Sequence, residues 1–164
     1  MKRSNAPTAF ALSRQKVDLI DREKYADAKG LHKGAYTLAE AETKAGEATT
    51  PKLILIATGS EIGLAMQARE QLNASGTPTR VVSMPCWEFF DVQTQKYRDE
   101  VLPPKVTARL AIEAGVSQGW HKYTGDKGNT LCVDKFGASA PAEDVFRDYG
   151  FTVENLIQEA NRLI

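Results

Sequence analysis

The chain has 164 residues, in which 21 Lys and Arg balance 21 Asp and Glu to give a formal net charge of +0. This length suits one hydrophobic core, since domains usually run about 100 to 200 residues. Without a net charge, no overall field attracts the chain to nucleic acid or to an anionic membrane surface, and we expect neither partner.

The two cysteines, Cys86 and Cys132, are far apart, and no Cys-x-x-Cys pair occurs. The sequence therefore indicates neither a zinc site nor a disulfide framework. The polar N-terminus has no apolar signal core after it, and no apolar run approaches the roughly 18 residues of a membrane span. We expect a cytoplasmic protein.

The N-terminal segment, residues 7–15, is predicted to form a short strand without a nearby partner. Because an unpaired apolar strand exposes its amide groups, we expect Ala9 to Leu12 to be disordered or to pair non-natively. Residues 16–50 are polar and interrupted by glycine, which is typical of a linker that crosses a surface. Within them, residues 35–38 are predicted to form a brief edge strand.

A strand, a helix and a second strand follow. Residues 53–57 are a continuous apolar run, as in a parallel strand that is covered on both faces. Ser60 is the expected cap of the next helix, Gly76 its end, and residues 80–84 the second strand, joined by a right-handed crossover. The apolar spacing of this helix places five side chains on one face: Ile62, Ala65, Met66, Arg69 and Leu72.

The rest of the chain continues the alternation. Residues 87–101 are predicted to be a broken helix, and residues 108–113 and 130–133 two further strands. Pro141 is expected to open a helix that Gly150 ends. The last helix should be capped by Thr152 and should dock on the sheet through an apolar stripe: Val153, Leu156, Ile157, Ala160 and Ile164. The pattern predicts an α/β three-layer sandwich.

Two loops offer possible ligand sites. Gly59 and Ser60 follow a strand, where open α/β sheets often bind ligands, but the glycine spacing differs from the dinucleotide fingerprint and Glu61 would repel a phosphate. The aromatic and basic residues from Trp120 to Tyr123 resemble a stacking platform for a base or sugar. Turn chemistry at the first loop and core packing at the second are the simpler interpretations.

Nucleophilic and acid–base residues form no recognisable set. Cys86 precedes a predicted helix whose start could lower its thiol pKa, but an ordinary, non-catalytic cysteine is the favoured interpretation, and Cys132 lies in an apolar strand and is predicted to be core. His32 and His121 have no partner in the sequence, and no carboxylate pair is evident. Arg14, between Ser13 and Gln15, has the guanidinium geometry that grips a phosphate, but from the residues alone a solvated charge is the simpler interpretation.

Short motifs spread along the chain resemble, in the same order, the C-terminal third of the transketolase family. They are Pro-Thr-Ala at 7–9 with Leu-Ser-Arg-Gln at 12–15, Gly-Ala-Tyr-Thr-Leu at 34–38, Ile-Ala-Thr-Gly-Ser-Glu at 56–61, Arg-Val-Val-Ser-Met-Pro at 80–85, Val-Leu-Pro at 101–103, Glu-Ala-Gly at 113–115, Phe-Gly-Ala-Ser-Ala-Pro-Ala at 136–142 and Gly-Phe-Thr-Val-Glu-Asn at 150–155. The resemblance implies a mixed, mostly parallel five-stranded sheet with one antiparallel strand.

The resemblance also implies a domain division. Residues 1–15 would be the tail of the preceding pyrimidine-binding domain, residues 16–50 a linker with a short edge strand, and residues 51–164 the C-terminal domain. In that family, two other domains bind thiamine diphosphate and a divalent metal, Mg²⁺ or Ca²⁺, across a homodimer interface. This chain would contain neither domain, so no cofactor, metal or catalytic residue is expected in it.

A single functional residue follows from the resemblance. Arg14 matches the arginine that contacts the phosphate of the sugar phosphate substrate, although Lys16 stands where the family commonly has Asn. The whole enzyme would transfer a two-carbon ketol unit in the pentose phosphate pathway, with this chain as a structural or regulatory domain beside the rest of the polypeptide and a second subunit. The alternatives are an independent small-ligand module at Gly59 and Ser60 or at Trp120, and a cysteine enzyme built on Cys86.

Overall fold

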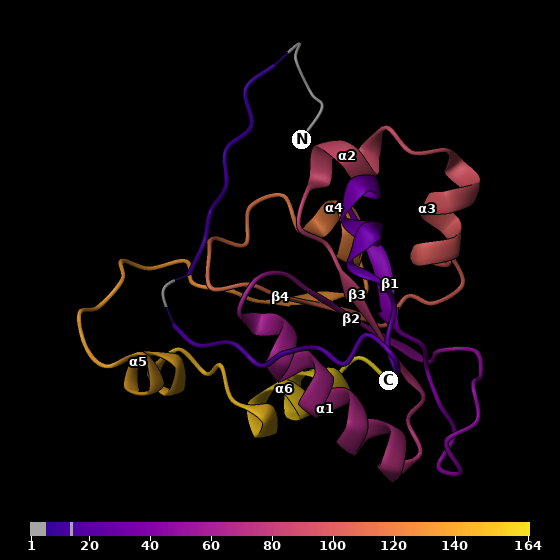
Figure 1. The fold of residues 1–164 in the computed structure, drawn as a ribbon. Helices are drawn as coiled ribbons and strands as arrows, with labels where there is room; N and C mark the ends of the chain where they lie inside the picture. The colour runs from indigo at the N-terminus through magenta and orange to yellow at the C-terminus, as the bar shows by residue number, and fades with distance from the viewer. Residues whose placement is uncertain (1–5, 14) are drawn as a thin grey trace.

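The computed structural model describes residues 6–13 and 15–164, which fold around a five-stranded sheet with the order β1-β3-β2-β4-β5 (Figure 1). β1 is antiparallel to β3, and the other neighbours are parallel. This sheet confirms the predicted fold class. The strands are β1 (Tyr36–Ala39), β2 (Leu53–Ala57), β3 (Thr79–Ser83), β4 (Arg109–Ile112) and β5 (Asn129–Leu131).

The central strand β2 explains the order of the sheet. All five of its residues are fully buried, because helices cover both of its faces. Leu55 pairs with Val81 of β3 on one side and with Leu110 of β4 on the other. Alternate side chains enter two separate hydrophobic clusters, one on each face. A continuous apolar run is therefore what this position requires.

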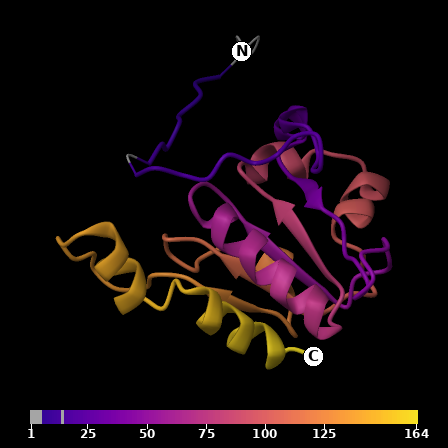
Figure 2. The ribbon, with the colours of Figure 1, turned by 60° about the horizontal axis from the view of Figure 1, so that its bottom comes forward.

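Helices form the two outer layers (Figures 1 and 2). One face is covered by α1 (Glu61–Ser75) and α6 (Val153–Asn161), with α5 (Ala142–Asp148) further out. The opposite face carries the 3-10 helix η1 (Ala28–Lys33) together with α2 (Trp87–Asp91), α3 (Gln95–Val101) and α4 (His121–Thr124). The predicted broken helix at 87–101 is thus the pair α2 and α3.

Of the helix ends predicted at Ser60, Gly76 and Thr152, the last two follow the expected turn chemistry. Gly76 ends α1 in the left-handed region, with φ 96°, and the Thr152 side chain accepts a hydrogen bond from Asn155 N at the start of α6. Ser60 does not cap α1 with its side chain, contrary to expectation. Its backbone is helical rather than extended, and its hydroxyl donates to the Glu61 carboxylate instead.

The N-terminal segment differs from the predicted strand. Among the described residues 6–13, none belongs to a strand, and the Phe10 and Leu12 side chains are exposed. A strand needs a neighbour for its backbone groups, and the sheet of this domain supplies none here. The predicted edge strand, by contrast, is β1, whose residues Tyr36, Leu38 and Ala39 are buried in the core.

Candidate functional site

The loops after β2 and β4 diverge at the carboxyl edge of the sheet. β2 leads into α1 on one face, whereas neighbouring β4 leads into α4 on the opposite face. Such a divergence is where open α/β sheets usually place a ligand site. The residues present there are the loop 58–60, Glu61 and the loop 113–120, and they constitute the carboxyl-edge site described below.

Glu61 is a buried carboxylate in the first turn of α1, with 4% of its surface exposed. The Ser60 hydroxyl donates to its Oε1 at 2.5 Å, and Ala114 N donates to its Oε2 at 3.2 Å. Burial raises the pKa of the Glu61 carboxyl, the two hydrogen bonds partly oppose the shift, and the Glu113 charge adds to it. Both oxygens have donors from the protein, so Glu61 ties α1 to the loop after β4.

Carboxylates also fix the rest of the loop 113–120. Trp120 Nε1 donates to Glu113 Oε2 at 2.8 Å, and Ser117 N donates to Asp134 Oδ1 at 2.8 Å. The hydrogen bonds from Ser117 hold the pKa of Asp134 below its ordinary value. Glu113 and Asp134 therefore each hold the loop in place through one carboxylate oxygen, whereas Glu61 uses both of its oxygens.

The aromatic cluster is core, as the packing interpretation predicted. Trp120 is fully buried and meets Trp87 edge-on, with ring centres 5.0 Å apart, and Tyr123 is 4% exposed. The Tyr123 hydroxyl donates to Asp91, and burial raises the pKa of the Tyr123 hydroxyl. A buried indole presents no face to a base or sugar. His121, beside it, is exposed.

Both thiols are poorly suited to nucleophilic catalysis. Burial raises the pKa of Cys86, whose Sγ lies 3.4 Å from Glu88 Oε2 as a donor to that carboxylate. Burial also raises the pKa of Cys132 to about 11. A reactive cysteine needs a lowered pKa, because the thiolate is the nucleophile. The structure thus gives no support to a cysteine enzyme built on Cys86.

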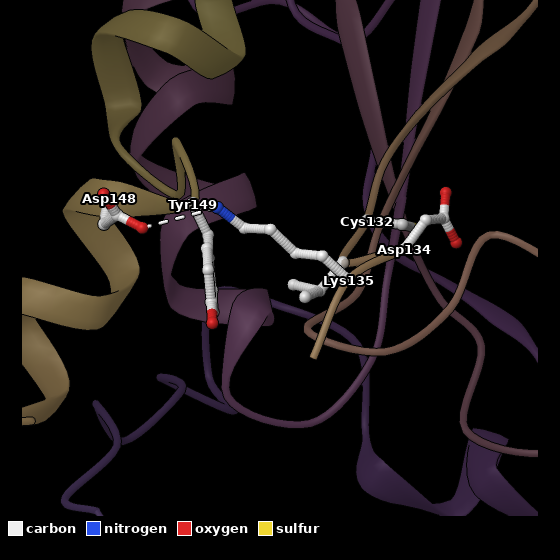
Figure 3. Close-up of a pocket in the computed structure, with 6 residues that line it drawn as sticks. Cys132, Asp134, Lys135, Asp148 and Tyr149 are labelled. Atoms are coloured by element: carbon white, nitrogen blue, oxygen red, sulfur yellow. Dashed lines mark hydrogen bonds and ion pairs between the residues drawn. The ribbon is translucent and has the colours of Figure 1, made fainter. Parts of the chain in front are cut away.

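A surface pocket of about 330 Å³ lies between the end of β5 and the end of α5 (Figure 3). Lys135 Nζ reaches Asp148 Oδ2 at 3.4 Å and lies over the Tyr149 ring, 4.4 Å from its centre. Asp134 points away from this pair, toward the loop that it binds. The single lysine of the lining is paired with Asp148, and Asp134 adds a second carboxylate, so the lining has no unpaired positive charge to attract an anionic ligand.

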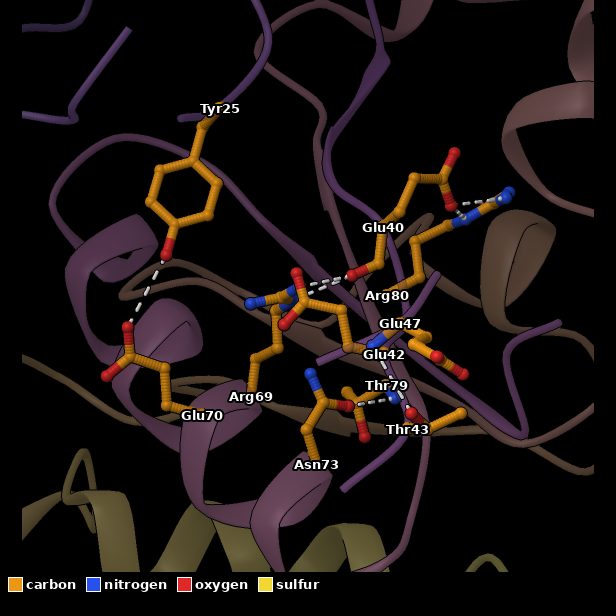
Figure 4. A network of polar contacts seen from close by, with 10 residues as sticks. All are labelled: Tyr25, Glu40, Glu42, Thr43, Glu47, Arg69, Glu70, Asn73, Thr79 and Arg80. Carbon is orange, nitrogen blue, oxygen red and sulfur yellow. Dashed lines mark hydrogen bonds and ion pairs between the residues drawn. The ribbon is translucent and has the colours of Figure 1, made fainter. Parts of the chain in front are cut away.

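A polar network along the second half of α1 went unpredicted (Figure 4). Arg69, 1% exposed, donates from Nε at 2.9 Å and from Nη2 to the carbonyl oxygen of Glu40, and its Nη2 lies 2.7 Å from Glu42 Oε1. Arg80 pairs with the Glu40 side chain at 2.8 Å. The sequence contained one indication of this network, because Arg69 is the charged residue on the otherwise apolar face of the predicted helix. The network binds the segment that carries β1 to the helix layer.

The carboxyl-edge site carries the carboxylates of Glu61 and Glu113, which would repel the phosphate groups of a diphosphate cofactor. The described part of the chain contains no group of three or more His, Cys, Asp or Glu that could hold a metal ion. It also contains no helix long and apolar enough to cross a membrane. Arg14, the phosphate-binding candidate, lies outside the described residues.

Comparison with known proteins decides the family. The sequence model of the "Transketolase-like TK C-terminal domain" matches residues 34–152. The chain belongs to this family. The transketolase of Aquifex aeolicus (strain VF5) is 49% identical to it over 164 residues, which is 100% of this chain and 22% of that protein. The match to the A. aeolicus protein also covers the residues before Gly34, whereas the match to the family's sequence model begins at Gly34.

Solved transketolases share the fold of this family member. The enzyme from Leishmania mexicana has a TM-score of 0.71 at 37% identity, over 82% of this chain and 19% of its own. A mutant transketolase from Pichia stipitis has a TM-score of 0.78 at 31% identity, over 92% and 20% of the two chains. The chain thus spans about a fifth of the length of the transketolases that it matches.

Proposed function

We propose that this chain is the C-terminal domain of a transketolase that transfers a two-carbon ketol unit between sugar phosphates in the cytoplasm. The catalytic centre, with thiamine diphosphate and Mg²⁺ or Ca²⁺, belongs to the preceding domains and a second subunit of a homodimer. The supporting observation is the 49% identity to the A. aeolicus transketolase along all 164 residues. By itself the chain is inactive, and its role in the enzyme is structural or regulatory.

The proposed division assigns residues 1–15 to the preceding domain, residues 16–50 to the connection, and residues 51–164 to the C-terminal domain. The connection adds β1 to the edge of the sheet and is bound to α1 through Arg69. An independent ligand module has less support, because the Ser60 hydroxyl and the Trp120 indole both have partners within the protein.

A chimera tests this function directly. The matching region of the A. aeolicus transketolase is replaced by this chain, and ketol transfer is measured with a ketose phosphate donor and an aldose phosphate acceptor. We expect an active chimera, and no turnover by the 164-residue chain alone with thiamine diphosphate and Mg²⁺. A chimera that folds, binds the cofactor and still fails to transfer the ketol unit would contradict the proposal, as would turnover by the chain alone.

A further inference from the structure

A second surface pocket, of about 300 Å³, lies at the amino edge of the sheet. β4 and β5 begin side by side at this edge, and the loops that lead into them line the pocket. The charged residues of the lining are Arg109, Asp126 and Lys127, and Thr107 and Thr124 add hydroxyl groups. The carboxyl-edge site is at the opposite ends of these strands, so the two sites share no residue.

Arg109 has carbonyl groups but no carboxylate as partners. Its guanidinium donates four hydrogen bonds of 2.7 to 3.1 Å to backbone carbonyl oxygens, three before β4 and one at Tyr123 in α4. Buried Arg69, by contrast, is paired with Glu42. Burial lowers the pKa of Arg109, and the charge of Asp99 partly opposes this shift. The pocket therefore holds a guanidinium charge that carbonyl dipoles stabilise but do not neutralise.

The turn at residues 125–128 presents further donors to the pocket. Gly128 N donates to Gly125 O at 3.2 Å and closes the turn, whereas the N–H groups of Asp126 and Lys127 donate to no other atom of the described residues. Within the same residues, the Lys127 ammonium group takes part in no ion pair. Backbone N–H groups of a turn can form a concavity that binds anions.

The backbone of this pocket is held in place without a ligand. A Cβ atom at Gly128 would lie 2.5 Å from the carbonyl oxygen of Thr124 and 2.6 Å from that of Arg109, so the turn packs directly against the start of β4. The Arg109 side chain joins the same two loops through its bonds to their carbonyl oxygens. A ligand would have little loop ordering to bring about, which favours binding.

We propose that this pocket binds a phosphate group, either as inorganic phosphate or as part of a small phosphorylated compound. Arg109 and Lys127 supply positive charge, and the two N–H groups of the turn supply hydrogen bonds. Asp126 is the single carboxylate of the lining, which leaves an excess of positive charge. The volume is at the lower end of the range for small-molecule sites, about 300 to 1,000 Å³. Binding is a property of this chain and does not depend on the proposed function.

Amide NMR spectra of the 164-residue chain test the site. Inorganic phosphate, glycerol phosphate and glycerol are titrated separately at constant ionic strength, so that charge screening stays the same. Both phosphate compounds should cause saturable shifts, largest at the amide signals of Asp126 and Lys127, and glycerol should cause none. The ratio of the two Kd values distinguishes a site for the free ion from a site for a phosphorylated compound.

Three substitutions at exposed positions show which charges act. Lys127→Gln should raise the Kd for inorganic phosphate about tenfold. Asp126→Asn should lower it about threefold, because a repelling carboxylate is removed. Lys96→Gln, at a lysine of α3 outside the lining, is the matched control and should leave the Kd unchanged. All three variants should keep the thermal midpoint of the unsubstituted chain.

Two results would overturn the phosphate site. The first is a titration in which inorganic phosphate shifts no amide signal saturably, or shifts mainly signals outside residues 104–109 and 124–128. The second is an equal rise in Kd for Lys127→Gln and Lys96→Gln, which would show that only the net charge of the chain matters. Ketol transfer by the chimera tests the proposed function separately from both.

Discussion

The Glu61 carboxyl group is buried where α1 begins, and burial raises its pKa. Below the ordinary value of 4.5, Glu61 is neutral in both the folded and the unfolded chain, and its contribution to stability is fully present. As the pH rises past this value, the unfolded chain releases the proton first. Stability is then lost until the pH passes the raised pKa of the folded state.

Glu61→Gln should remove this loss. A neutral amide can accept the hydrogen bond from Ala114 N and donate to the Ser60 hydroxyl, so the variant keeps both contacts. Urea unfolding from about pH 4 to about pH 7 should show a free-energy difference that increasingly favours the variant as pH rises. Glu143→Gln, the same substitution at an exposed position of α5, is the control. A pH-independent difference for Glu61→Gln would refute the linkage.

At the level of elements, Arg69 connects α1 to the segment that carries β1. Arg69→Met keeps much of the side-chain volume but leaves the carbonyl oxygen of Glu40 without its donors. We expect a loss of about 2 to 3 kcal/mol in the free energy of unfolding, the scale of hydrogen bonds to a charged group. Amide exchange near Glu40 should also accelerate. Glu42→Gln keeps an acceptor at that position and should cost less; equal costs would contradict the role given to Arg69.

The elements that the sequence predicted well are those with a local signal. Residues 53–57 form β2 as expected, because a strand covered on both faces needs an unbroken apolar run. α4 and η1 were missed, since each is short and depends on contacts made after folding, such as the burial of Trp120 beside α4. The prediction that Ser60 caps α1 was wrong, because the Ser60 hydroxyl donates its hydrogen bond to the neighbouring buried carboxylate of Glu61.

The carboxyl-edge site was predictable only in its position. The strand pattern places Gly59 to Glu61 at the end of β2, but nothing local indicates that Ala114 and Asp134 belong to the same arrangement. Arg69 shows the same limit, because its partners Glu40 and Glu42 lie in a segment that was predicted to be a linker. Contacts between residues far apart in the sequence carry no period that a sequence pattern could reveal.

At the scale of the whole molecule, the proposed role of Arg14 can be tested in the chimera. Arg14→Ala should lower kcat/KM for phosphorylated substrates, because a charge-assisted hydrogen bond to the phosphate is lost. The loss of transition-state stabilisation calculated from the ratio of kcat/KM values should be about 1.5 to 3 kcal/mol. Steady-state kinetics with phosphorylated and unphosphorylated sugars separate this effect from a general one. Lys16→Ala is the nearby control. An equal loss with unphosphorylated sugars would exclude a phosphate contact.

The position of β1 has a consequence for the order of events during synthesis. β1 leaves the ribosome before β2 and β3, yet its hydrogen-bonding partner is β3, with Tyr36 opposite Ser83. A nascent chain must therefore keep an apolar tetrapeptide unpaired until α1 and the strand after it have emerged. Pausing translation before Ser83 would prolong this interval and give chaperones or neighbouring nascent chains an open strand to bind.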